Sequence, residues 1–107
     1  MKVLFLSEIR EYFAELAFLL YQENYFGFEE NAIRYARELF DEIEVDLPRK
    51  QKKKAPDHFS KYGNDLSYAV FKKNNITQWY VFFETYIQEK TYVVTYIGNN
   101  HTIAQYL

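Results

Sequence analysis

Apolar residues recur at helical spacing over two long segments in the first half of the chain. Across residues 8–24, apolar side chains three or four positions apart are Ile9, Phe13, Leu16, Ala17 and Leu20. Residues 28–46 repeat this spacing with Ala32, Tyr35, Ala36, Leu39, Phe40 and Ile43. Gly27 separates the two segments and Pro48 follows the second, and both residue types interrupt helices. The pattern therefore predicts two helices joined by a short connection, which is a helical hairpin.

The remaining apolar segments have the composition of strands. β-Branched and aromatic residues are concentrated in one run before the hairpin and three runs after it, at residues 2–6, 66–73, 77–87 and 91–97. The last three runs are joined by connections too short for crossovers, so these strands should be antiparallel. Residues 101–107 are expected to add a short final strand. The prediction is an α+β fold of order β-α-α-β-β-β, with the hairpin packed on one face of a mainly antiparallel sheet.

Alternation within residues 77–87 assigns side chains to two faces of this sheet. The apolar set that should face the helices is Trp79, Val81, Phe83 and Ile87, joined by Val93 and Ile97 from the next strand. The opposite set is Gln78, Tyr80, Phe82, Glu84 and Tyr86, joined by Tyr92 and Tyr96. An aromatic face left open to water would be adhesive, so we expect a cover over it. A nucleic acid, a protein partner and the chain's own residues 48–64 are the three possible covers.

Composition limits the classes of protein to which the chain can belong. The length of 107 residues fits a single domain, and 22 of the residues are aromatic, more than a core of this size obviously needs. The absence of cysteine indicates a reducing cytoplasm, and no apolar run approaches the ~20 residues that span a bilayer. No phosphate-binding glycine loop and no metal-ligand spacing is present, so we expect no cofactor and no metal.

The net charge of −2 divides unevenly along the chain. Residues 1–47 hold 4 basic and 11 acidic side chains, whereas residues 48–107 hold 9 basic and 4 acidic ones. This division favours a basic working surface and an acidic back. Phosphates would then be bound by Lys50, Lys52, Lys53, Lys54 and Lys61, and bases would stack on Tyr80 and Tyr86. The alternative is that residues 48–64 form a solvated basic loop and that the tyrosines form a second small core.

Two segments near the C-terminus carry a family resemblance. They are Thr77-Gln78-Trp79-Tyr80-Val81-Phe82-Phe83 and Tyr92-Val93-Val94-Thr95-Tyr96-Ile97, the second followed closely by Asn99-Asn100-His101. Together with the order of elements, they resemble the RelE/ParE superfamily of toxins from type II toxin–antitoxin systems. The resemblance implies a curved sheet, a cognate antitoxin as partner, and one of two activities. RelE-like members are ribosome-dependent mRNA endonucleases that use no metal, and ParE-like members inhibit DNA gyrase without nuclease chemistry.

The nuclease alternative implies roles for five residues. His101 would act as acid or base, and the Tyr106 ring would stack on or orient the RNA. Lys72 and Lys73 would stabilise the transition state, with Glu84 as an alternative base. Nuclease relatives are usually strongly basic and carry arginine in the catalytic sheet, and this chain departs from both features. Gyrase-type inhibition, an inactivated toxin, a protein-interaction domain and a small-ligand pocket between sheet and helices therefore stay open.

Overall fold

A helical hairpin and a sheet form two layers. The computed structural model describes residues 1–22 and 29–107. Strand β1 (Lys2–Phe5) precedes helix α1 (Ser7–Gln22), and helix α2 (Glu29–Asp46) completes the hairpin. Both predicted helices are confirmed within these bounds. The last two residues predicted for the first helix, 23 and 24, together with Gly27 and the predicted start of the second helix at position 28, lie outside the described residues.

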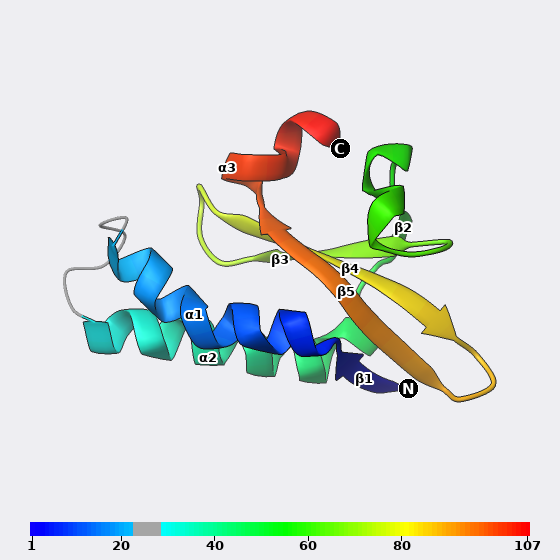
Figure 1. Cartoon of the computed structure of the whole chain (residues 1–107), viewed down its shortest axis with the longest axis horizontal. Coiled ribbons are helices and arrows are strands. Elements are labelled where there is room, and N and C mark those ends of the chain that lie inside the picture. Colours follow the sequence, from blue (N-terminus) through cyan, green and yellow to red (C-terminus); the bar gives the residue numbers. More distant parts are fainter. Residues whose placement is uncertain (23–28) are drawn as a thin grey trace.

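The sheet has five strands in the order β1-β5-β4-β3-β2 (Figure 1). The other strands are β2 (Lys53–Lys54), β3 (Ser67–Lys72), β4 (Gln78–Tyr86) and β5 (Thr91–Asn99). β1 pairs in parallel with β5, and every other pairing is antiparallel. The α+β class and the packing of the hairpin on the sheet are therefore as predicted.

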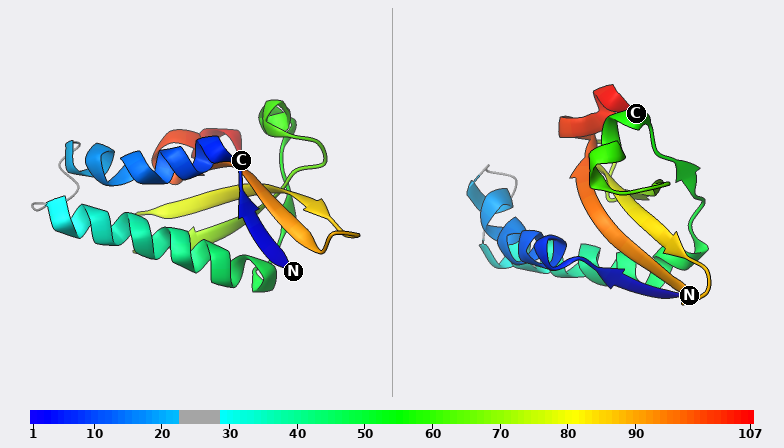
Figure 2. Two further views of the ribbon diagram at one scale, coloured as in Figure 1. Left: turned by 60° about the horizontal axis from the view of Figure 1, so that its bottom comes forward. Right: turned by 45° about the vertical axis from the view of Figure 1, so that its right-hand side comes forward.

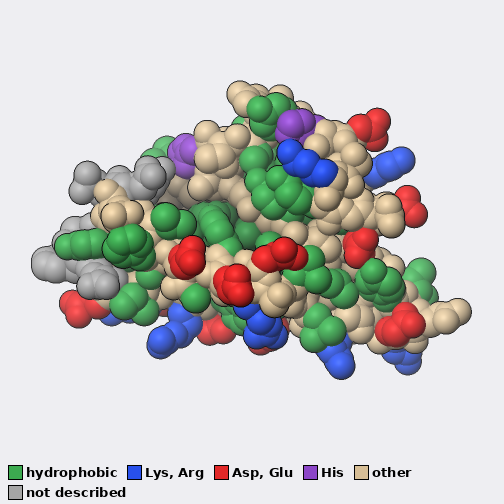
Figure 3. Space-filling model, in the orientation of Figure 1, with side chains coloured by type: hydrophobic (Ala, Val, Ile, Leu, Met, Phe, Trp, Pro, Cys, Tyr) green, Lys and Arg blue, Asp and Glu red, His purple; other side chains and the backbone are tan. Residues whose placement is uncertain are grey.

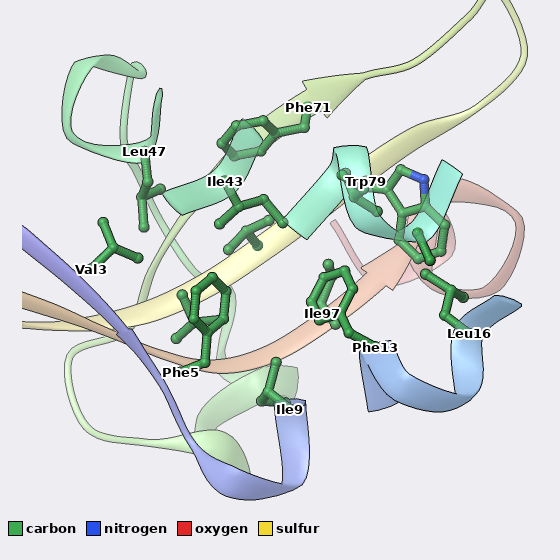
Figure 4. Packing of buried hydrophobic residues seen from close by; sticks show 14 of the residues in the cluster. Val3, Phe5, Ile9, Phe13, Leu16, Ile43, Leu47, Phe71, Trp79 and Ile97 are labelled. Atoms are coloured by element: carbon green, nitrogen blue, oxygen red, sulfur yellow. The ribbon is translucent and has the colours of Figure 1, made fainter. Parts of the chain in front are cut away.

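The larger core lies between the hairpin and the sheet. Side chains from α1, α2 and four strands interlock there (Figure 4), and Trp79, Phe71 and Phe83 are almost completely buried. Trp79 satisfies its indole Nε1–H by donating to the Tyr35 hydroxyl at 2.8 Å. This core confirms the predicted direction of Trp79, Val81 and Phe83. Ile87 was predicted to face the helices, but it is 79% exposed in the turn after β4.

The second face of the sheet is covered by the chain itself. The 3₁₀-helix η2 (Asp57–Tyr62) and the C-terminal segment, made of α3 (Asn100–Ile103) and the 3₁₀-helix η3 (Ala104–Tyr106), lie on the side opposite the hairpin (Figure 2). The smaller core beneath them consists of Phe59, Leu66, Phe82 and Ile103. Phe59 stacks on Phe82 with ring centroids 4.4 Å apart. Three covers for this face were considered from the sequence. The structure shows the third of them, the chain's own residues 48–64.

The predicted final strand is wrong. The Asn99 side chain accepts a hydrogen bond from the backbone N–H of His101 at 2.9 Å, which caps a helix N-terminus. The chain therefore leaves the sheet after Asn99 and forms α3 and then η3. Ile103 is carried over the second face and packs against Gly98, where a Cβ would lie 3.1 Å from the isoleucine Cδ1.

A β-bulge corrects two further predictions. Phe82 pairs with Tyr96 but Phe83 pairs with Val94, so one extra residue lies in β5 at that point. Alternation is interrupted there, and Tyr92 packs against the hairpin-side core and not on the second face. Val93 is paired with Glu84 on the second face, opposite to its predicted direction. Simple alternation could not detect the inserted residue.

Candidate functional site

The segment around His101 is tied to the turn between β3 and β4. The Asn100 Oδ1 atom accepts from the backbone N–H of Gln78 at 2.8 Å, and its Nδ2 donates to the Ile76 carbonyl at 3.0 Å. The His101 Nε2 lies 3.3 Å from the Thr77 hydroxyl. The asparagine therefore fastens α3 to the turn and places the imidazole beside it at the surface.

The turn is itself held by an asparagine. The Asn74 Oδ1 accepts from the backbone N–H groups of both Ile76 and Thr77, each at 2.9 Å. Asn side chains often close turns in this way because they reproduce the bond of a backbone carbonyl. Ile76 projects from this ordered turn with 72% of its surface exposed.

A pocket of about 330 Å³ opens between this turn and the hairpin, and we call it the His101 pocket. It is lined by Leu20, Tyr35, Asn74, Ile76, Thr77, Trp79, Asn99 and His101. Burial raises the pKa of Tyr35 above its ordinary value. The pocket combines apolar walls with a few polar groups at its rim, and its size suits one large side chain or a small molecule.

Lys72 and Lys73 lie on opposite faces of the sheet edge. Lys73 Nζ forms an ion pair with Glu42 of α2 at 3.1 Å and lies 5.7 Å from the centroid of the Tyr35 ring. Lys72 alternates with Phe71, which faces the hairpin, so Lys72 is on the second face and is exposed. The two predicted transition-state cations therefore do not converge on one point.

Tyr106 contacts the basic loop. Its ring stacks on the imidazole of His58 with centroids 3.7 Å apart and planes within 4°. His58 belongs to η2, so this contact joins the C-terminal segment to the segment that covers the second face. The structure gives Tyr106 a packing partner other than His101.

Glu84 contacts the chain just beyond η2, the 3₁₀-helix that covers the second face. Its carboxylate accepts from the backbone N–H of Asn64 at 2.9 Å and from the Tyr86 hydroxyl at 2.9 Å. The Tyr86 bond raises the pKa of that phenol. Glu84 lies seven residues beyond Thr77 along the chain of β4, which at ~3.3 Å per residue is roughly 20 Å from the His101 contact. One substrate phosphate cannot touch both groups.

The predicted phosphate-binding lysines are divided among three places. Lys50 lies 4.6 Å from the Phe71 ring centroid and Lys52 5.1 Å from that of Tyr92, and burial lowers the pKa of Lys52. Lys53 and Lys54 form the exposed edge strand β2, and Lys61 lies over the ring of Tyr62. Of the predicted base-stacking rings, Tyr80 is half-buried and donates to Gln78 Oε1, whereas Tyr86 is exposed and bonded to Glu84. Lys50, Lys52 and Lys61 therefore each lie over an aromatic ring of the chain itself.

Sequence reasoning missed most of the pocket. Asn74 and Asn99 were visible only as turn residues, although asparagine before a short polar run is also a capping signal. Leu20 and Tyr35 come from two helices, and no local pattern shows that they meet Ile76. Among residues 1–22 and 29–107, no group of three or more His, Cys, Asp or Glu could hold a metal ion. No helix in those ranges is long and apolar enough to cross a membrane.

Comparisons with protein-family models, with curated proteins and with solved structures found no match for this chain.

Proposed function

We propose that the chain is a toxin-like protein of RelE/ParE-type architecture that works by docking another protein at the His101 pocket, without cutting RNA. The main support for this proposal is that the candidate catalytic side chains contact different parts of the chain. His101 lies beside Thr77, Tyr106 on His58, Lys73 against Glu42, and Glu84 against Asn64 and Tyr86. Each is part of a different structural contact.

Cleavage through the ribose 2′-hydroxyl needs three groups around one phosphorus atom. A base takes the 2′ proton, a cation stabilises the added negative charge, and an acid protonates the leaving oxygen. Lys73 lies near the pocket that His101 lines, and its charge is paired with Glu42. That geometry favours binding over catalysis.

The pocket has features of a protein-docking site. Trp79 forms part of its wall, the asparagine bonds hold the rim in place, and Ile76 stands exposed beside it. A rim that is already ordered loses little conformational entropy on binding, so contacts made there contribute more to affinity. The ligand that fits is a protein that inserts one apolar side chain beside Ile76. In a toxin–antitoxin pair, the target and a cognate antitoxin would both be cytoplasmic proteins, with gyrase-type inhibition as the precedent.

The first experiment is induced expression of the protein alone and together with the neighbouring gene. The proposal expects growth arrest by the protein alone and recovery when the neighbour is co-expressed. Growth that is unaffected by the protein alone would contradict the toxin assignment.

Three variants separate docking from cleavage. Ile76→Asp puts a charge on the pocket rim and should abolish arrest. Ile87→Asp changes a similarly exposed isoleucine in the turn between β4 and β5, and arrest should persist in that variant. His101→Gln keeps a hydrogen-bonding side chain of similar reach but cannot transfer protons near pH 7, so arrest should persist. Arrest that survives Ile76→Asp and disappears in His101→Gln would overturn the docking proposal in favour of nuclease action.

A further inference from the structure

A second hollow separates α1 from the C-terminal segment. It encloses about 350 Å³ and is lined by Ile9, Tyr12, Tyr96, Ile97, Gly98, Asn99 and Thr102. The first two residues belong to α1, the next four to the end of β5, and Thr102 to α3. We call this hollow the α1–α3 groove. Apart from Asn99, it uses none of the residues of the His101 pocket.

Two tyrosines give the groove an aromatic lining. Burial raises the pKa of Tyr12 to about 12, and burial together with the neighbouring Tyr62 raises the pKa of Tyr96 to about 12. Both tyrosines line the groove and are uncharged at physiological pH. The ring of Tyr96 stacks on the ring of Tyr62, with centroids 3.8 Å apart.

Carboxylates of α1 lie beside the groove residue Tyr12. Glu8 and Glu15 are four residues before and three residues after Tyr12, so they lie on the same side of the helix as this tyrosine, and Glu11 lies about 100° further round the helix. All three are exposed, and Figure 3 shows acidic side chains in a row over α1. The ion pairs found among the described residues, Arg49–Asp46 and Lys73–Glu42, involve none of the three.

The basic side chain of α1, Arg10, is directed to other rings. Arg10 is on the same helix, but its guanidinium lies over the rings of Phe5 and Phe40, 5.9 Å from each centroid. The groove therefore combines an aromatic lining with an apolar floor, and the nearby carboxylates of Glu8 and Glu15 form no ion pair among the described residues.

We infer that the α1–α3 groove binds a basic segment of a partner protein, with an arginine inserted against the tyrosine rings and within reach of the glutamates. A guanidinium suits this surface because it is weakly hydrated, stacks on aromatic faces and pairs with carboxylates. An apolar residue beside the arginine would contact Ile9 and Ile97. The inference goes beyond the proposed function and uses a different surface, so either can fail alone.

The test uses the full chain, labelled with ¹⁵N, and a short peptide in which two arginines flank a leucine. Amide shifts on peptide addition should centre on Tyr12, Gly98 and Thr102, and binding should weaken as salt rises. A matched peptide with glutamates in place of the arginines should leave these amides unmoved. Shifts spread over the surface, or centred on other residues, would overturn the inference.

Variants with equal changes in charge make the test specific. The triple change Glu8→Gln, Glu11→Gln and Glu15→Gln should weaken peptide binding about tenfold, since exposed ion pairs each contribute a fraction of a tenfold step. The control neutralises three exposed acids of α2 instead, at Glu38, Asp41 and Glu44, and should change affinity less than about twofold. Equal losses in both variants would mean that net charge alone attracts the peptide, and would overturn the inference.

A second variant tests the groove without touching its acids. Thr102→Arg places a guanidinium of the chain's own at the rim and should compete with the peptide. Unchanged peptide affinity in this variant would contradict the assignment. Salt-sensitive self-association of the unmodified chain, with shifts at Tyr12 that grow with protein concentration, would point to a second copy as occupant and overturn the choice of a foreign segment.

Discussion

The two faces of the sheet are closed in different ways. On one face, two long amphipathic helices bury a core of 18 residues in the described part of the chain, whereas the other face has a core of four buried residues beneath short 3₁₀ and helical segments. A long helix brings several buried apolar side chains on one rigid element, whereas η2 and the C-terminal segment each bring one buried side chain, Phe59 and Ile103. The hairpin side therefore contributes most of the stability, while the second face is closed by segments that can open locally.

Adjacent phenylalanines test this difference most strongly. Phe83 and Phe82 are both completely buried, but Phe83 faces the hairpin and Phe82 faces the covering segments. Phe83→Ala should lower the free energy of unfolding by about 3–5 kcal/mol, and Phe82→Ala by less, because short segments can settle into the space left. Urea unfolding of both variants measures the difference. An equal or larger loss for Phe82→Ala would show that the two faces contribute alike.

The next largest effect is expected at Phe59. Its removal leaves the ring of Phe82 without its stacking partner and detaches η2 from the sheet. We expect Phe59→Ala to cost about 2 kcal/mol, below the range typical of Phe in a core, and to speed proteolytic cleavage within residues 48–64. Limited proteolysis followed by mass spectrometry locates the cut. Cleavage that stays as slow as in the unmodified protein would mean that η2 is held by other contacts.

A smaller effect is expected where the covering segment turns toward β3. Gly63 has φ of 154°, and a Cβ there would lie 2.8 Å from Glu84 Oε2 and 2.9 Å from Leu66 Cδ2. Gly63→Ala should therefore cost about 1–3 kcal/mol through strain and displacement of the carboxylate. Gly98→Ala is the control, since Gly98 lacks a positive φ and its Cβ would lie 3.1–3.5 Å from three side-chain atoms of one residue, Ile103. Thermal unfolding should rank Gly63→Ala as the more damaging change.

The smallest effect is a loss of stability at alkaline pH. The pKa values of Tyr12 and Tyr96 rise from 10.0 to about 12 on folding, so the folded state favours the protonated phenols. The stability this contributes is fully present below pH 10 and is lost as the pH rises toward 12. Tyr12→Phe and Tyr96→Phe should each reduce the slope of unfolding free energy against pH in that window. A slope unchanged in both variants would contradict the assignment to these phenols.

Much of the fold was predictable because its signals are local. The apolar spacing in residues 8–24 and 28–46 predicted both helices, and alternation predicted the directions of Trp79, Val81 and Phe83. The errors arose where a single residue changes the pattern. The bulge reversed Tyr92 and Val93, and the cap at Asn99 turned an expected strand into a helix.

The candidate site was less predictable because it is built from distant segments. His101 was recognisable as a titratable group after a strand, but its neighbours Leu20, Tyr35 and Ile76 come from three other elements. Their meeting depends on the tilt of the hairpin over the sheet, which no spacing within one segment encodes. The division of the lysines among Phe71, Tyr92 and Tyr62 likewise depends on how residues 48–64 cross the sheet edge.

The most direct test of the central claim, that the chain acts by docking and not by cleavage, is to map mRNA 5′ ends in cells arrested by its expression. Primer extension on abundant transcripts, with the His101→Gln variant beside the unmodified protein, detects cleavage on ribosomes. The account predicts arrest without new 5′ ends in either strain. New ends at regular positions within codons, present with the unmodified chain and absent with His101→Gln, would contradict it.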